Sequence, residues 1–326
     1  MKYESLISEG FSGVISFLSN GVAEIKSAYG YADLPNRREN TIDTKFATAT
    51  AGKSFIACAI MRLIEQGRLR LNSQIGNIID VHLGKIDRSV TIKELLTHTS
   101  GIPDYFYETA LGNYAELFRD YPSYRVRKPK DLLPIFINKP MTYDGYGRFS
   151  YINSGYTLLA MAIESITGKP FDVYLKEEIF DKCEMNDTGY YSLDRLPPNT
   201  ANNYLYDSAA DEYYSNIYAT EVKGTGAGGA FTTANDMEKF WIGLTNKKFF
   251  NLLSTFEDMI IPQTGEKYYG YGFWLRGKNP VMQGSEPGIS FISIFDINKN
   301  NIITLISNYG NNVWHLLDEI LEDEFY

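Results

Sequence analysis

The chain opens with two apolar segments that predict a β-hairpin. Residues 13–19 (GVISFLS) and 22–32 (VAEIKSAYGYA) are separated by Asn20-Gly21. Asn-Gly readily adopts the positive φ angles of a type I′ turn, which joins two antiparallel strands tightly. We therefore expect the fold to begin with a pair of strands.

A helical pattern follows the polar turn at residues 34–43. The spacing predicts a helix from about Ala51 to Gln66, ended by Gly67. Its apolar positions are Phe55, Ile56, Ala59, Ile60, Leu63 and Ile64. Thr50 lies where this helix begins.

The pattern stays mainly helical from residue 75 to residue 196. The helical segments are residues 90–98, 131–138, 154–168 and 171–180, and the loops between them are rich in Pro, Tyr, Asp and Gly. A glycine-rich loop at 224–230 then precedes a helix that Thr233 or Asn235 can cap. We interpret the middle of the chain as an inserted helical region.

Strand patterns return near the C-terminus. They cover residues 269–277, 288–298 and 301–310, and residues 313–326 form an amphipathic helical pattern. Early and late strands are expected to share one antiparallel sheet, flanked by terminal helices. The predicted fold class is thus α/β (α+β). Residues 1–50 and 218–326 form its sheet region, residues 51–217 form the mainly helical region, and the cleft of one compact unit lies between them.

Composition excludes several classes of function. With 326 residues and 44% hydrophobic content, the chain can bury a large core. Its net charge of −9 argues against a nucleic-acid partner. Two isolated cysteines (Cys58, Cys183) and three scattered histidines make a metal site improbable. We expect neither a metal nor an organic cofactor.

The sequence shows no pattern that would place the chain in a membrane. The N-terminus lacks the apolar run of a signal peptide, and no window approaches the roughly 20 apolar residues that span a bilayer. The expected location is cytoplasmic for the chain as given, and extracytoplasmic if an export signal has been removed. The oligomeric state is not indicated.

The segment TATAGKSF, residues 48–55, supports two incompatible hypotheses. Gly52-Lys53-Ser54 resembles the end of a phosphate-binding loop, but that motif needs a glycine at Ala47 and a preceding hydrophobic strand. Thr50-Ala51-Gly52-Lys53 instead matches the nucleophile motif S-x-x-K, with threonine replacing serine. The polar approach to the segment and the missing βαβ alternation favour the second hypothesis.

An S-x-x-K site requires further groups from other elements. A lysine three residues after the nucleophile lies on the same helix face and can accept its proton. Tyr151 and Asn153 supply a phenol and an amide at the start of another predicted helix, and a strand edge with free amides would stabilise an oxyanion. The residues thus favour acyl transfer over nucleotide binding.

These motifs resemble the serine β-lactamase and penicillin-binding-protein superfamily, in the branch of class C β-lactamases, DD-peptidases and related esterases. The similarity covers nearly the whole chain. The matching stretches, in chain order, are FSGVISFLSNGVAEIKSAYGYAD, KFATATAGKSF, VTIKELLTHTSGIPDY, SYINSGYTLLA, GAGGAFTTANDMEKF, YGYGFWL and the PG of SEPGISF.

The resemblance implies roles for individual residues. Thr50 would be the nucleophile, Lys53 its base, Tyr151 the proton shuttle and Asn153 the residue that orients the substrate oxygen. The backbone N–H groups of Thr50 and Ser285 would form the oxyanion hole. The implied reaction is the hydrolysis of an ester or amide of a small or peptide-like acyl compound, and it would pass through a covalent acyl-enzyme.

Two departures from the family pattern change the expected chemistry. The extra methyl group of Thr50 restricts χ1 and crowds an incoming carbonyl. The strand motif that usually carries Lys or His reads Met282-Gln283-Gly284, which we take as the substrate-binding strand, and methionine offers no charge to a substrate carboxylate. The alternative is therefore a catalytically impaired homologue that binds a peptidoglycan-like or peptide ligand. Thr50 could also serve simply as a helix N-cap.

Overall fold

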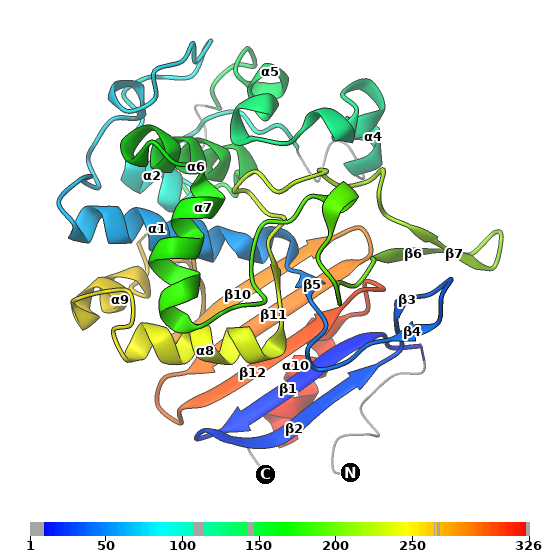
Figure 1. The fold of residues 1–326 in the computed structure, drawn as a ribbon. Helices are drawn as coiled ribbons and strands as arrows, with labels where there is room; N and C mark the ends of the chain where they lie inside the picture. The colour runs from blue at the N-terminus through cyan, green and yellow to red at the C-terminus, as the bar shows by residue number, and fades with distance from the viewer. Residues whose placement is uncertain (1–9, 107–113, 143–146, 264, 266–267, 324–326) are drawn as a thin grey trace.

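The computed structural model describes residues 10–106, 114–142, 147–263, 265 and 268–323. A six-stranded antiparallel sheet lies at its centre, in the order β2-β1-β12-β11-β10-β9 (Figure 1). The strands are β1 (Gly13–Ser19), β2 (Val22–Tyr29), β9 (Trp274–Arg276), β10 (Asn279–Glu286), β11 (Ile289–Asp296) and β12 (Asn301–Ser307). Early and late segments therefore share one sheet, as the sequence predicts.

The first hairpin is confirmed, but its second strand is shorter than expected. Asn20 and Gly21 both adopt positive φ angles, 49° and 81°, between the paired residues Ser19 and Val22. The strand ends at Tyr29 because Gly30 turns the backbone with φ 67°. The following segment, expected to be a turn, contains a small ladder of β3 (Tyr31–Asp33) and β4 (Arg38–Glu39).

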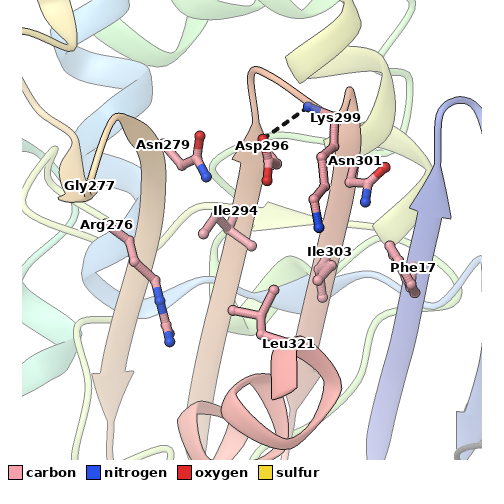
Figure 2. A pocket seen from close by; sticks show the side chains of 10 residues that line it. All are labelled: Phe17, Arg276, Gly277, Asn279, Ile294, Asp296, Lys299, Asn301, Ile303 and Leu321. Atoms are coloured by element: carbon pink, nitrogen blue, oxygen red, sulfur yellow. Dashed lines mark hydrogen bonds between the residues drawn. The ribbon is translucent and has the colours of Figure 1, made fainter. Parts of the chain in front are cut away.

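One face of the sheet packs against the C-terminal helix α10 (Val313–Asp323). An N-terminal partner of this terminal helix would fall in residues 1–9, outside the described residues. A cavity of about 240 Å³ opens between α10 and the ends of the strands (Figure 2). Apolar side chains from β1, β11, β12 and α10 form its floor, and polar side chains surround it: Phe17, Ile294, Ile303 and Leu321, with Arg276, Asn279, Asp296, Lys299 and Asn301.

Helices cover the other face and extend beyond it (Figure 1). They are α1 (Lys53–Glu65), α2 (Ile92–Leu96), α4 (Tyr114–Asp120), α5 (Leu133–Phe136), α6 (Asn153–Thr167), α7 (Phe171–Leu175), α8 (Ala234–Thr245) and α9 (Leu253–Met259). Helix α8 packs on β1 and β12, and its start is capped by the Thr233 side chain, one of the two expected caps. Helices α1 and α6 pack against each other within the main core.

The region expected to be mainly helical also contains a hairpin. Strands β6 (Tyr204–Asp207) and β7 (Glu212–Ser215) pair through a turn and expose several tyrosine rings. Among the described residues, no helix combines the length and apolar character needed to cross a bilayer.

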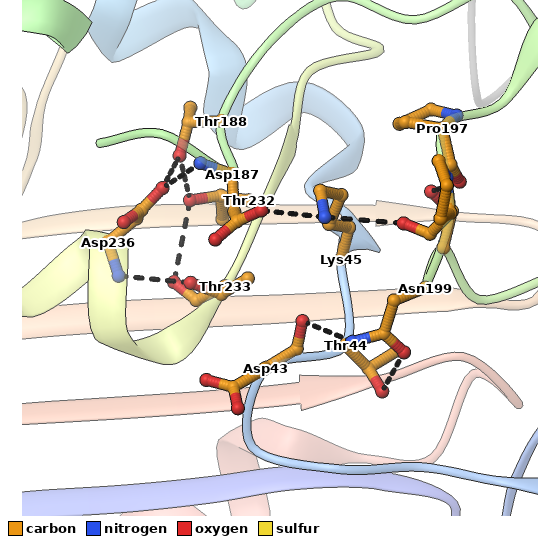
Figure 3. Close-up of polar contacts among 12 residues, drawn as sticks. Asp43, Thr44, Lys45, Asp187, Thr188, Pro197, Asn199, Thr232, Thr233 and Asp236 are labelled. Atoms are coloured by element: carbon orange, nitrogen blue, oxygen red, sulfur yellow. Dashed lines mark hydrogen bonds and ion pairs between the residues drawn. The ribbon is translucent and has the colours of Figure 1, made fainter. Parts of the chain in front are cut away.

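A polar network fixes the segment that leads to Thr50. This segment passes through β5 (Phe46–Ala47), which pairs with β8 (Phe231–Thr232). Just before β5, the Lys45 ammonium forms an ion pair of 2.7 Å with Asp187, and the Asn199 amide donates to the carbonyl of Asp43 (Figure 3). Chain segments far apart in sequence thus hold the approach to the candidate site.

Candidate active site

Thr50 lies in a tight turn that directly precedes the central helix. The 3₁₀ turn Ala49–Gly52 continues into α1 at Lys53, so the regular helix begins two residues later than predicted. Ala49 takes φ 48°, an unfavourable conformation for a residue with a Cβ atom. The N-cap residues are Thr48 for the turn and Gly52 for the helix, and neither makes a side-chain cap bond. Thr50 is therefore not an N-cap, and its side chain is partly exposed.

Lys53 is a buried cation at the first turn of α1. Its side chain is 2% exposed. The ammonium donates to Asn153 Oδ1 at 2.7 Å and to the backbone carbonyl of Ala227. It also lies over the Tyr151 ring, 4.8 Å from the centroid. A buried charge requires such partners, and these contacts bring α1, α6 and the glycine-rich loop together at one atom.

Tyr151 belongs to a group of packed aromatic rings. Its ring stacks on Trp274 of β9 at 5.8 Å with an interplanar angle of 21°, and it lies 4.5 Å from the His98 ring. Trp274 in turn stacks on Tyr268. Trp274 and Tyr268, which the sequence analysis did not single out as site residues, therefore help to set the Tyr151 ring orientation.

Asn153 holds Lys53 and is itself held by Asp104. Its Oδ1 atom accepts from Lys53, while its Nδ2 atom donates to Asp104 Oδ2 at 3.2 Å. Asn153 is 2% exposed. Its observed contacts thus position the lysine, and the expected contact with a substrate oxygen stays a prediction.

Asp104 is a functional candidate that sequence reasoning missed. The residue before α6, Ile152, provides no side-chain cap. Instead Asp104, from a distant loop, accepts the backbone N–H groups of Asn153 at 2.7 Å and Ser154 at 3.0 Å. A carboxylate at a helix N-terminus satisfies unpaired amides and interacts favourably with the helix dipole. Burial raises the pKa of Asp104, and the donated hydrogen bonds and Lys53 act in the opposite direction. In the sequence, Asp104 could have been noticed as the acidic residue at the end of the family-like stretch VTIKELLTHTSGIPDY.

His98 acts as a structural link. Its Nδ1 atom accepts the N–H of Ile152 at 3.1 Å, so the Nε2 atom carries the proton and donates to the Tyr269 hydroxyl at 3.0 Å. Burial, followed by the Lys53 charge, lowers the pKa of His98 well below its ordinary value. A neutral histidine thus fixes the backbone that precedes Asn153.

Strand β10 corrects the predicted substrate-binding side chains. Met282 is 0% exposed and lies in the main core. Gln283 points to the opposite face, where its Oε1 atom accepts from the Trp314 indole of α10 at 2.9 Å. Because side chains alternate along a strand, the face that bears Met282 also bears Gly284 and Glu286. Neither the Met282 nor the Gln283 side chain is therefore placed to contact substrate.

Gly284 allows β10 to approach the nucleophile turn closely. A Cβ atom there would lie 2.6 Å from the backbone nitrogens of Thr50 and Ala51. Strand β9 pairs with β10 only as far as Val281, so the edge beyond it is not covered by β9. The backbone of Ser285 consequently lies on a strand segment next to Thr50, as an oxyanion hole made of their two N–H groups would require.

Two carboxyl groups, Glu221 and Glu286, lie on the Lys53 side of this strand. Burial, and next the Glu286 charge, raise the pKa of Glu221 to about 8. Burial also raises the pKa of Glu286 to about 7, against the effect of the Lys53 ammonium. Glu286 follows Ser285 directly. Alternation along the strand could have identified it, because it shares the site face with Gly284.

The structure does not support the phosphate-loop hypothesis. In such a loop the lysine reaches phosphate groups, whereas the Lys53 ammonium is buried against Asn153 and Ala227. The central sheet is antiparallel and lacks the parallel βαβ unit that a nucleotide-binding loop requires. The cavity in Figure 2 lies on the α10 face of the sheet, opposite Thr50.

Comparison with known proteins identifies the family. A family model described as Beta-lactamase matches residues 8–318. The chain is similar to a solved penicillin-binding protein from Bacillus halodurans, with a TM-score of 0.90, 32% identity and coverage of 96% of both chains. It is 24% identical to the teichoic acid D-alanine hydrolase of Staphylococcus aureus, over 96% of this chain and 75% of that protein.

A third similarity concerns the fold. The D-amino acid amidase of Ochrobactrum anthropi, solved with L-phenylalanine amide, superposes with a TM-score of 0.77 at 24% identity, covering 96% of this chain and 93% of that chain. The match over nearly the whole length agrees with the mixed α/β architecture described above. The chain therefore belongs to the beta-lactamase family and is a β-lactamase-like acyl hydrolase.

Proposed function

We propose that the chain hydrolyses esters or amides through a covalent acyl ester on Thr50. The observation that carries this proposal is the position of Lys53. Its buried ammonium group lies one helical turn after Thr50 and is held by Asn153 and Ala227. Gly284 brings the β10 edge against the backbone of Thr50 at the same place.

The reaction proceeds in two balanced steps. The Lys53 ammonium first loses a proton to solvent; the Thr50 oxygen then attacks the substrate carbonyl carbon while the neutral Lys53 amine takes the hydroxyl proton. The carbonyl oxygen becomes negative between the N–H groups of Thr50 and Ser285. The bond to the leaving group then breaks, and Tyr151 passes the proton to the departing oxygen or nitrogen. In the second step, a water molecule gives a proton to Lys53 and attacks the acyl carbon of the Thr50 ester. The bond from that carbon to the Thr50 oxygen breaks, the proton passes to this oxygen, and the acid is released.

We infer that the preferred substrates lack a carboxylate next to the scissile bond. The strand that faces the site carries no cation at Met282 or Gln283, because neither a methionine nor a glutamine side chain can be charged. The nearest charged side chain along the strand is Glu286. Such a site disfavours an anionic acyl compound and favours a neutral or cationic one. Carboxylate-bearing β-lactams should consequently react slowly.

Intact-protein mass spectrometry tests the nucleophile. The parent chain, Thr50→Ser, Thr50→Ala and Lys53→Ala are incubated with a fluorophosphonate, a penicillin and an activated neutral ester. We expect an adduct that maps to residue 50 in the parent, a faster one in Thr50→Ser, and none in the two alanine variants. An equal yield of adduct in all four proteins would contradict the assignment of Thr50.

A second candidate is an impaired homologue that binds an acyl ligand without turnover. The β-branched Thr50 side chain favours it, because a methyl group on Cβ restricts χ1 and crowds the path of an incoming carbonyl. In that case no reagent would label the folded parent. A ligand would nevertheless raise the melting temperature of parent and Thr50→Ala equally. Absence of any stabilising ligand in a broad screen would count against this candidate.

A further inference from the structure

The cavity of Figure 2 lies outside the candidate active site, on the α10 face of the central sheet. Strand register explains its apolar floor. Phe17 is directly opposite Ile303, which is directly opposite Ile294, and side chains opposite each other in a sheet share a face. Leu321 lines the cavity from the last turn of α10. The cavity is thus an open end of the core between the sheet and α10.

The hairpin of β9 and β10 supplies a polar pair on the same face. Arg276 and Asn279 are directly opposite each other in this hairpin, and both line the cavity. The Oδ1 atom of Asn279 accepts the backbone N–H of Ile297 at 3.2 Å, which identifies the other end of the amide as the –NH₂ group. This –NH₂ group makes no hydrogen bond to the residues that the structure describes. Its two donors are therefore available to a ligand.

The Arg276 guanidinium also has unused donors. Its Nη1 atom donates to Asp318 of α10 at 2.7 Å, and both side chains of this ion pair are 52% exposed. The edge formed by Nε and Nη2 makes no hydrogen bond within the described part of the chain. Two parallel N–H groups on one edge of a guanidinium match the two oxygens of a carboxylate. The hairpin thus offers a planar donor edge next to an amide donor.

The lining of the cavity carries more positive than negative charge. Arg276 and Lys299 are its cations, and Asp296 is the one carboxylate among the described lining residues. The Oδ1 atom of Asp296 is already used, because it accepts the backbone N–H groups of Asn298 and Lys299 at 2.9 and 3.1 Å. In Figure 2 the Lys299 side chain extends from this turn toward Ile303. Unused donors and a positive lining favour an anionic head group.

We propose that this cavity binds a small amphiphilic carboxylate. The carboxylate group lies between the free edge of Arg276 and the –NH₂ group of Asn279, and the alkyl chain lies on the apolar floor. An apolar cavity of about 150 Å³ holds one benzene molecule, so the volume of about 240 Å³ in this protein holds about ten heavy atoms. Octanoate has this size. The site is separate from Thr50, and the proposal therefore goes beyond acyl transfer.

Isothermal titration calorimetry of the full chain tests the head group. The ligands are octanoate, octanamide and octylamine, which share one alkyl chain length. We expect the Kd of octanoate to be roughly 10- to 100-fold lower than the Kd of the other two ligands, because an ionised acceptor strengthens the hydrogen bonds from arginine. Equal Kd values for the three ligands, or a lower Kd for octylamine, would overturn the proposal.

Two variants locate the bound octanoate. Arg276→Gln removes the proposed partner of the carboxylate and should raise the Kd roughly 10-fold or more. Leu321→Trp places a larger side chain in the cavity and should abolish binding. Parent-like Kd values in both variants would place octanoate elsewhere on the protein and refute the site.

Lys278→Gln is the matched control. It removes the same charge from the adjoining turn, but Lys278 is exposed and does not line the cavity. Its Kd for octanoate should equal that of the parent, and an increase as large as in Arg276→Gln would refute a specific contact. Surface ion pairs contribute little to stability, so Arg276→Gln should keep the melting temperature of the parent. This variant therefore decides the question even if Leu321→Trp does not fold.

Discussion

At the scale of single residues, the candidate site depends on a chain of contacts from Lys53 through Asn153 to Asp104. Each member is buried, and each is joined to the next by a hydrogen bond. Partly satisfied buried networks are unstable, so the three side chains hold one another in a single arrangement. The Lys53 side chain, the proposed base, is thereby held in one position by Asn153 and Ala227.

The close approach of β10 to the backbone of Thr50 requires a residue without a side chain at Gly284. The variant Gly284→Ala tests this requirement. The added Cβ atom would lie 2.6 Å from the backbone nitrogens of Thr50 and Ala51, so the nucleophile turn or the strand must move. We expect kcat/KM to fall about 100-fold or more, because small displacements of reacting groups have large effects. Gly265→Ala meets no atom within 4 Å and serves as the control. Unchanged kinetics in Gly284→Ala would contradict the close approach of β10.

At the scale of elements, the start of α6 is set by side chains outside that helix. Asp104 binds its first amides, and His98 binds the amide of Ile152 just before them. The two faces of strand β10 likewise have different neighbours. Gln283 binds α10 on one face, and Gly284 packs against the turn that carries Thr50 on the other. The site is thus an arrangement of one helix start, one tight turn and one strand edge.

Asp104→Asn tests the role of this distant cap. The amide retains one acceptor oxygen but places an NH₂ group against donors, so the free energy of unfolding should fall by about 2 kcal/mol. Because α6 carries Asn153, activity should fall as well. Asp207→Asn, at an exposed turn of the β6–β7 hairpin where Asp207 accepts two amides, should change neither quantity. Chemical denaturation and ester hydrolysis measure the two effects, and full stability in Asp104→Asn would exclude the cap.

At the scale of the whole molecule, the fold places three carboxyl groups near the buried Lys53, and burial favours the neutral forms of these carboxyl groups. Glu221, Glu286 and Asp104 surround Lys53, within a chain whose net charge is −9. Burial makes the ionised carboxyl groups costly.

Stability should therefore fall as the pH rises through neutrality. The folded-state pKa values of Glu221 and Glu286, about 8 and about 7, lie above the ordinary value near 4.5. A raised pKa means that the folded chain binds more protons than the unfolded chain. The contribution of these two carboxyl groups to the free energy of unfolding is therefore complete below pH 4.5 and is lost between pH 4.5 and pH 8. We expect the Tm to drop by roughly 5 °C from pH 6 to pH 9. Glu221→Gln should reduce this drop, and an unchanged drop in that variant would contradict the shift.

Local patterns in the sequence were sufficient to predict the hairpin at Asn20-Gly21, the helix after Thr50, the late strands and the cap at Thr233. Each depends on contacts between residues close in sequence, such as turn geometry, helical spacing or a side chain three residues from an amide. The S-x-x-K spacing has the same character, because positions 50 and 53 share one helical turn. These features do not require knowledge of the rest of the fold.

Only the tertiary structure decided which distant groups meet. Asp104 reaches α6 across the fold, Glu221 and Glu286 come from separate loops and strands, and Asn203 joins them from the β6 region. Likewise, Met282 lies on the same strand face as Gly284 but is buried in the core, and Gln283 lies on the opposite face, bound to α10. The sequence by itself determined the local elements and the motif positions, because short-range geometry fixes them. Burial, electrostatics and side-chain direction were decided by packing between elements, which spacing along the chain does not encode.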